Sequence, residues 1–277
     1  MKHPMQLTTK EILHIKQYLT NKNYINWSLS SVYYKMLRDK TAFMGLVTFY
    51  KYAKLLKLTR QKPQHRRKKH KIGIRAEKPL QILHADMTIF RPLNNTKVYI
   101  YFIADNFSRK ILNWKASLEY SAKYTFENLK EVYDANNIND NDVEIDFMVD
   151  DGSENKAEVD TFIKNSKINK VVAQKDVIFS NSMIEAVNKR IKYDFLFPTE
   201  IKDFKQTVKQ LETAVEEYNN KPYFPLHGLT PNEVFAGKLP DKTMFKNEII
   251  KAKQLRTAKP SPKVIIENKK DICQIHK

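Results

Sequence analysis

The stretch that decides the fold is residues 81–116, QILHADMTIFRPLNNTKVYIYFIADNFSRKILNWKA. Three of its segments are rich in Ile, Val, Phe and Tyr and therefore predict β-strands: Gln81–Phe90, Lys97–Ala104 and Lys110–Ala116. The sequences between them, Asn94-Asn95 and Asp105-Asn106-Phe107-Ser108, consist of turn-forming residues. The stretch therefore predicts three consecutive strands joined by short turns.

Beyond residue 120, helical and strand patterns alternate. Apolar residues at helical spacing predict helices at Ser121–Asn136, Lys156–Asn165, Ser182–Phe195 and Lys202–Tyr218, and short β-rich runs predict strands at Glu144–Val149 and Ile168–Ala173. Three strands followed by alternating helices and strands indicate an α/β fold with a mixed five-stranded sheet flanked by helices. This element order is that of the ribonuclease-H-like fold.

The first 57 residues have a different, purely helical pattern. Thr8 followed by Glu11 forms a capping-box signature, and apolar spacing predicts helices over residues 8–20, Ser30–Leu37 and Thr48–Leu56. Two short helices around a tight connection suggest a DNA-binding helix-turn-helix. An ordinary small helical bundle has the same pattern and is the alternative.

The chain is strongly basic, with 49 Lys and Arg against 31 Asp and Glu and a net charge of +18, which favours a polyanionic partner. Lys57–Arg75 contains nine Lys and Arg and no acid, centred on Arg66, Arg67, Lys68 and Lys69. We expect a basic linker that lies along DNA phosphates, with a merely solvated spacer as the alternative. No long apolar run or secretory signal is visible, so we expect no membrane partner and a bacterial cytoplasmic, nucleoid-associated location.

Three acidic residues stand at positions that need an explanation. Asp86 interrupts an apolar strand, Asp150 directly ends another, and Glu185 lies on a helix beside Lys189 and Lys192 at i+4 and i+7. Taken singly, each has an ordinary alternative: an exposed strand position, an Asp-Asp-Gly turn and a solvent-facing Glu–Lys pair. Taken together in a basic chain, converging carboxylates suggest divalent metal ions acting on a phosphodiester.

Five stretches, in order, resemble the integrase-type catalytic core of DDE transposases, the group that contains insertion-sequence transposases and retroviral integrases. They are Leu83–Thr88, Ile103–Lys110, Val149–Asn155, Asn181–Lys192 and Tyr218–Pro222, the last continuing to Phe235. The resemblance covers about residues 80 to 237.

The resemblance implies that Asp86, Asp150 and Glu185 are a metal-binding catalytic triad for Mg²⁺ or Mn²⁺, with two ions expected. It also implies that Lys192 contacts DNA near the site, and we expect Lys189 and Arg190 to hold phosphates beside it. The family usually has Asn where this chain has Asp151, so the choice between Asp150 and Asp151 stays open. We prefer Asp150 because it ends the strand.

Two further departures concern the supporting segment, in which Lys221 and Tyr223 replace the usual Arg and His. Asp105 also matches a family acid, although a turn-forming role is favoured for it. The zinc-binding His/Cys module of retroviral integrases is absent, and the single cysteine, Cys273, excludes an intrachain disulfide.

The predicted domains are a helix-turn-helix-like region at 1–57, a basic linker at 58–78, a catalytic core at 79–237 and a basic, partly disordered tail at 238–277. The predicted function is DNA cleavage and strand transfer by a transposase of a mobile element. The expected partners are double-stranded DNA, other copies of the chain in a homo-oligomer, and a separate upstream helix-turn-helix subunit. The rivals are a plain ribonuclease-H-like nuclease and a non-catalytic DNA-binding protein or decayed transposase.

Overall fold

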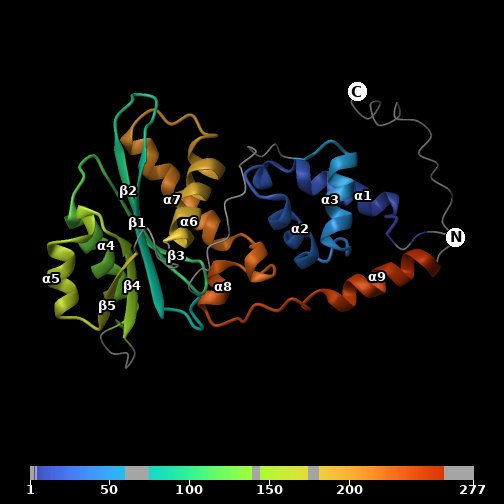
Figure 1. Cartoon of the computed structure of the whole chain (residues 1–277). Helices are drawn as coiled ribbons and strands as arrows, with labels where there is room; N and C mark the ends of the chain where they lie inside the picture. The colour runs from blue at the N-terminus through green and yellow to red at the C-terminus, as the bar shows by residue number, and fades with distance from the viewer. Residues whose placement is uncertain (1–2, 4, 60–74, 139–143, 174–180, 259–277) are drawn as a thin grey trace. The chain divides into compact units, whose positions relative to one another are not determined.

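The computed structural model describes residues 3, 5–59, 75–138, 144–173 and 181–258. The chain divides into two compact units (Figure 1). The sheet unit contains residues 66–221 and 230–239, and the helical unit contains residues 1–65, 222–229 and 240–277. Each unit has its own apolar core and is described separately.

The sheet unit is built on five strands in the order β3-β2-β1-β4-β5. These strands are β1 Ile82–Phe90, β2 Val98–Asp105, β3 Ile111–Ser117, β4 Ile145–Asp150 and β5 Ile168–Ala173. The first three form an antiparallel meander because short turns join them, whereas β4 and β5 each follow a helix and pair in parallel. The predicted mixed five-stranded α/β fold is therefore confirmed.

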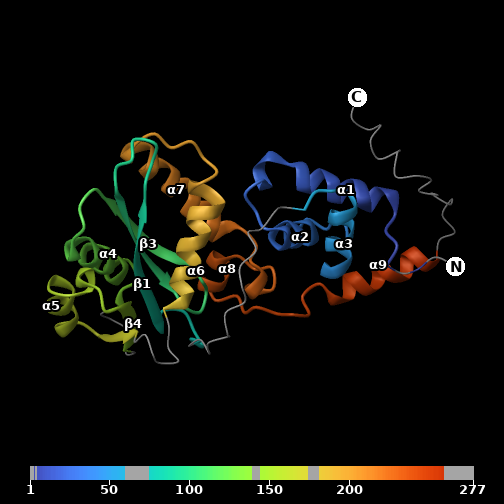
Figure 2. The same cartoon turned by 45° about the horizontal axis from the view of Figure 1, so that its top comes forward.

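Helices cover both faces of this sheet (Figures 1 and 2). Helices α4, Ala122–Ala135, and α5, Glu158–Lys164, lie on one face, and α6, Ser182–Arg190, and α7, Phe204–Asn220, lie on the other. The helix predicted over Ser182–Phe195 changes to a π-helix at Ile191–Leu196, and the short helix α8, Pro231–Phe235, follows α7. The sheet unit therefore has an apolar cluster on each face of the sheet, and the central strands contribute to both because their side chains alternate between the faces.

The helical unit begins with α1 Thr9–Thr20, α2 Leu29–Arg38 and α3 Leu46–Leu55, with a 3₁₀ turn at Lys22–Tyr24. The predicted capping box is present, because the Glu11 N–H donates to Thr8 Oγ1 at 3.3 Å and the Thr8 N–H donates to Glu11 Oε2 at 2.8 Å. The apolar stripes of the three helices pack on one another around buried Ile15, Met36 and Phe49.

Two later segments complete the helical unit. Helix α9, Lys246–Ala258, is held by Arg256, whose Nη2 donates to Glu11 Oε1 at 2.6 Å and also to the Phe43 carbonyl. The segment 222–229 includes a 3₁₀ turn at Phe224–Leu226, and its Gly228 carbonyl accepts a 3.1 Å hydrogen bond from Arg38 Nη1. Residues 246–258 of the expected tail are thus helical because a nearly buried arginine ties them to the core, and residues 259–277 lie outside the described part.

Within the described residues, none of the helices combines the length and the apolar character that a membrane crossing requires.

Candidate active site

Strands β1 and β4 bring two of the predicted acids together. The parallel register pairs Ile82 with Asp146 and His84 with Met148, and Asp86 and Asp150 each follow two residues after the last pair. Residues two apart on a strand point to the same face, as do residues in register on neighbouring strands, which lie about 4.8 Å apart. The carboxylates of Asp86 in the middle of β1 and Asp150 at the end of β4 therefore lie near each other, and Asp150 repels the charge of Asp86.

Burial and charge repulsion leave Asp86 reluctant to ionise. Its pKa rises to about 7, first because it is buried and then because Asp150 and, more weakly, Glu185 repel its negative charge. The Met87 backbone N–H and the Asn188 side chain oppose this rise, and Asn188 Nδ2 donates to Asp86 Oδ2 at 2.6 Å. Burial also raises the pKa of Asp150, which the Asn181 side chain lowers by hydrogen bonding and the Glu154 carboxylate raises by repulsion.

Glu185 lies in the first turn of α6 but is exposed. Its charge raises the pKa of Asp86 less than the charge of Asp150 does. Across the described ranges, no three His, Cys, Asp or Glu side chains lie close enough together to hold a metal ion. The structure brings Asp86 and Asp150 together and leaves Glu185 at the edge of the pair.

Asp151 has a different environment from Asp150. It is fully exposed and pairs with Lys156, whose Nζ lies 2.9 Å from Asp151 Oδ1 and holds the pKa of Asp151 below its ordinary value. Asp150, not Asp151, is the carboxylate that acts on Asp86.

The predicted DNA-binding cations fall into two groups. Lys192 is half-buried and reaches back to β1, where its Nζ donates to Thr88 Oγ1 at 2.7 Å, and burial lowers its pKa. Lys189 is exposed, with its Nζ 5.9 Å from the centre of the Tyr193 ring, and Arg190 is half-buried on the same helix. Arg66, Arg67, Lys68 and Lys69 lie outside the described residues.

Three buried amide and imidazole side chains form a hydrogen-bonded chain, one member of which, Asn181, also bonds to Asp150, and the sequence did not single them out. His84 Nδ1 lies 2.8 Å from Asn181 Oδ1, and Asn106 Nδ2 lies 2.8 Å from His84 Nε2. Asn181 Nδ2 also donates to the Ala85 carbonyl at 2.8 Å. A sequence signal for His84 was available, because it is a polar residue within an apolar strand two positions before Asp86.

A buried lysine directly follows helix α7. Lys221 is only 1% exposed, its Nζ is 3.5 Å from Asp194 Oδ2, and the ammonium lies 4.6 Å from the centre of the Phe195 ring. Burial lowers the pKa of Lys221 to about 8, an effect that Asp194 partly offsets. This lysine anchors the end of α7 against the π-helix.

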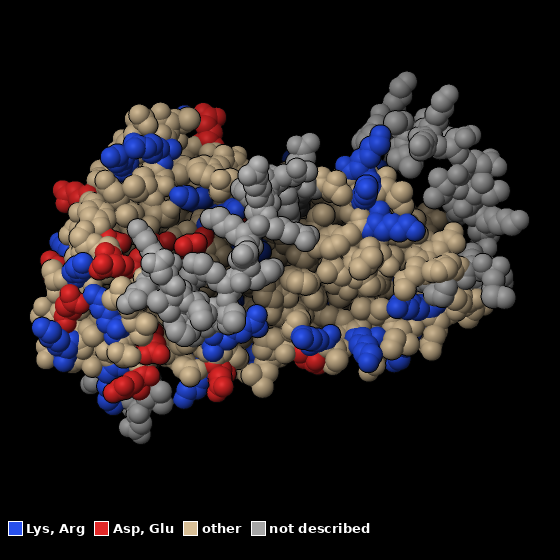
Figure 3. Space-filling model, in the orientation of Figure 1, with Lys and Arg blue, Asp and Glu red and all other residues tan. Residues whose placement is uncertain are grey.

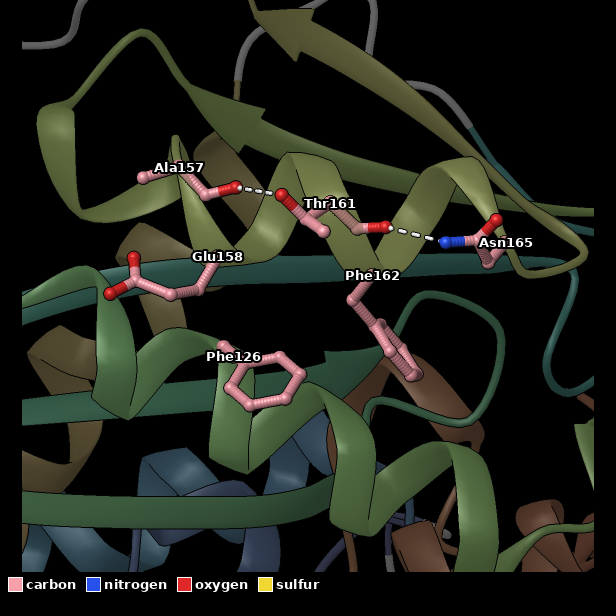
Figure 4. A pocket seen from close by; sticks show the side chains of 6 residues that line it. All are labelled: Phe126, Ala157, Glu158, Thr161, Phe162 and Asn165. Carbon is pink, nitrogen blue, oxygen red and sulfur yellow. Dashed lines mark hydrogen bonds between the residues drawn. The ribbon is translucent and has the colours of Figure 1, made fainter.

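A separate pocket of about 640 Å³ lies between α4 and α5, on the face of the sheet opposite α6 (Figure 4). Phe126 and Phe162 line it with Glu158, and Thr161 Oγ1 donates to the Ala157 carbonyl at 3.1 Å. The pocket is mainly apolar and contains none of the predicted site residues.

Comparison with known proteins shows the fold. No family model matches the chain, and no curated protein matches it. A chain of a simian T-cell lymphotropic virus intasome, solved in complex with the PP2A regulatory subunit B56 gamma, aligns with a TM-score of 0.50 and 14% identity over 81% of this chain and 75% of that one. The catalytic core domain of BIV integrase aligns with a TM-score of 0.42 and 15% identity, over 57% of this chain and 94% of that domain. The first alignment shows a shared fold, and the mixed five-stranded sheet with helices on both faces is the ribonuclease-H-like arrangement expected from the sequence.

Proposed function

We propose that the chain is a metal-dependent DNA strand transferase of the DDE transposase kind. The observation that carries this proposal is the pair formed by Asp86 and Asp150 on adjacent parallel strands, with the pKa of Asp86 raised to about 7. Two carboxylates held close together without a compensating cation repel each other, and a bound divalent cation would relieve that repulsion.

The residues present fit Mg²⁺ or Mn²⁺. Asp86, Asp150 and Glu185 are oxygen donors of the type that these ions prefer, and Glu185 is exposed on the turn of α6 next to Asn188, which contacts Asp86. When bound, two such ions activate the attacking oxygen and stabilise the leaving oxygen of an in-line phosphoryl displacement. The triad assignment is the proposal, with Glu185 as the member that must turn toward the aspartates.

The other residues act by binding and orientation. Asn188 donates to Oδ2 of Asp86 and so orients this carboxylate. Lys192, held at β1 by Thr88, and the exposed Lys189 would bind DNA phosphates beside the acids. No Ser or Tyr nucleophile is needed, since water and then a DNA 3′-hydroxyl would attack.

We assign duplex DNA recognition to the helical unit, with α3 as the helix that enters the major groove. Val47, Tyr50, Lys51 and Lys54 are exposed at positions i, i+3, i+4 and i+7, so they form one solvent-facing stripe on α3. Residues 40–59 contain no acid, and few acidic side chains are visible over the helices of this unit in Figure 3. An apolar and aromatic stripe flanked by lysines suits base edges and phosphates together.

Strand transfer is the decisive assay. The full chain is incubated with Mg²⁺, labelled duplexes from the flanks of its gene and a plasmid target. Wild type should join label to plasmid. Asp86→Asn and Glu185→Gln should lower joining by at least about 10³-fold while leaving DNA binding within about threefold. Asp151→Asn is the matched control, because that aspartate is exposed and paired with Lys156, and it should retain activity.

The outcomes separate the rivals. Cleaved but never joined DNA would identify a plain nuclease, and DNA binding without cleavage would favour a DNA-binding remnant. The homo-oligomer and the separate upstream helix-turn-helix subunit remain predictions, which sizing of the DNA complex and addition of that subunit would test.

A further inference from the structure

Asn181 is the N-cap residue of α6, and it does not cap the helix with its side chain. An N-cap Asn ordinarily accepts a hydrogen bond from the first turn, which stabilises a helix by about 1 kcal/mol. Thr8, Ser28, Ser121, Asp203 and Thr230 make such bonds at the starts of α1, α2, α4, α7 and α8. The Asn181 side chain instead bonds to β1, through the Ala85 carbonyl and His84.

The direction of each hydrogen bond in this network follows from its neighbours. Asn106 Oδ1 accepts from the Ala76 N–H at 2.8 Å, so its Nδ2 donates to His84 Nε2. His84 Nε2 is then an acceptor, and the proton of the neutral ring is on Nδ1, which donates to Asn181 Oδ1. The remaining donor of Asn181, Nδ2, bonds to the Ala85 carbonyl. Each group in this network therefore donates to the next one, from the Ala76 N–H to the Ala85 carbonyl of β1.

The network fixes the part of α6 that carries Glu185. The Glu185 N–H donates to the Asn181 carbonyl at 3.2 Å, so Asn181 is one turn before Glu185. Asn188, three residues after Glu185, ties the next turn to Asp86. Glu185 therefore lies between two ties to β1, at i−4 and i+3, on one side of the helix.

We propose that His84 and Asn181 are positioning residues that set Glu185 at the correct distance from Asp86 and Asp150 for shared metal ions. This rests on the proposed function. His84 contacts none of the three acids, whereas Asn181 also hydrogen-bonds to Asp150, and both side chains are at most 2% exposed. Partners of this kind commonly tune metal affinity by 10-fold to 100-fold.

Two substitutions of His84 separate positioning from mere core stability. His84→Asn places an amide N–H where Nδ1 is, so it keeps the bond to Asn181 and loses the bond to Asn106. His84→Gln places its amide oxygen where Nε2 is, so it still accepts the hydrogen bond from Asn106 and loses the bond to Asn181. The Asn variant also leaves the larger cavity in the core.

The test measures two quantities on the full chain: Mn²⁺ affinity by calorimetry and the urea midpoint of unfolding in EDTA. We expect His84→Gln to weaken Mn²⁺ binding about 10-fold or more with the smaller loss of urea midpoint. We expect His84→Asn to keep Mn²⁺ affinity within about threefold of wild type, with the larger loss of midpoint. Asn181→Ala should bind Mn²⁺ as weakly as His84→Gln does.

Metal affinity that falls in step with stability across the three variants, or that does not change in any of them, would overturn the proposal. Strand transfer by wild type is measured in parallel. Wild type that joins DNA while His84→Gln binds Mn²⁺ normally would refute the positioning role alone. Wild type that binds Mn²⁺ with the expected variant order but joins no DNA would refute the proposed function alone, and wild type that binds no Mn²⁺ would refute both.

Discussion

Replacing Asp86 by Asn should stabilise the metal-free protein at neutral and alkaline pH. The carboxylate has a folded-state pKa of about 7 against an ordinary value of 3.8. Its ionisation therefore opposes folding, because the unfolded chain releases this proton more readily than the folded chain does. The amide of Asn carries no charge, and its oxygen can still accept the hydrogen bond from Asn188.

The magnitude follows from the two pKa values. They differ by about three pH units, and each unit corresponds to about 1.4 kcal/mol, so the cost of ionised Asp86 above pH 7 is about 4 kcal/mol. The cost grows from pH 3.8 upward and is complete above the folded-state pKa, so it is only about 1 kcal/mol at pH 4.5. A sheet unit of this size should melt about 10 °C higher after the substitution at pH 8.

Thermal unfolding in EDTA from pH 4.5 to 8.5 measures this difference. The chain has two tryptophans, Trp27 in the helical unit and Trp114 on β3, so a Trp27→Phe background makes fluorescence report the sheet unit alone. Saturating Mg²⁺ should stabilise wild type and leave Asp86→Asn unchanged, because ligand binding to the folded state adds to its stability. An Asp86→Asn protein that is less stable than wild type at pH 8, or a difference that does not vary with pH, would refute this reasoning.

Three further substitutions test contacts outside the acids. Arg256→Met should lower the free energy of unfolding of the helical unit by about 3 kcal/mol, because Glu11 loses the arginine that lowers its pKa. The stabilisation by Arg256 is present above pH 4.5 and is lost as pH falls through the folded-state pKa of Glu11. Trp27 fluorescence in a Trp114→Phe background should therefore show the stability difference between variant and wild type becoming smaller in acid. Lys221→Met should stabilise the sheet unit at pH 7 by up to about 3 kcal/mol, because burial lowers the pKa of this lysine from 10.5 to about 8. Urea unfolding should show a smaller stabilisation by the substitution at pH 10 than at pH 7. Gly228→Ala should lower the free energy of unfolding by about 1–3 kcal/mol, because φ is +97° and the new Cβ would lie 2.4 Å from the Tyr34 ring. Gly237→Ala is the control, since it has the same φ but no atom within 4 Å of the new Cβ. An equal loss of stability in both variants, measured by urea unfolding, would contradict the steric part of this explanation.

The sheet and its helices could be predicted from local sequence, because strand runs, turn residues and helical spacing all agree between residues 81 and 220. The proximity of Asp86 and Asp150 depends on the strand order, in which β1 lies next to β4, and the sequence alone did not give that order. The roles of Asn181 and His84 could not be predicted in this way. Their partners lie up to 97 residues away, and Asn181 reads as an ordinary helix cap until its side-chain contacts are known.

The end of α6 and the helix α9 illustrate the same limit. The spacing over residues 182–195 cannot distinguish an α-helix from one that widens to a π-helix at Ile191, since the apolar positions are nearly shared. Helix α9 has little amphipathic pattern and reads as a solvated tail. Its place in the core depends on one arginine that meets Glu11 from 245 residues away.

The discontinuous helical unit also constrains how the protein is made. A ribosome delivers Glu11 early, but its partner Arg256 is synthesised 245 residues later. The sheet unit consists mostly of the uninterrupted stretch 66–221, whereas helices α1 to α3 have their own apolar core but lack the ion pair between Glu11 and Arg256 until residue 256 is made. Nascent chains arrested before residue 256 should therefore have a helical unit that proteases cleave faster than in the complete chain.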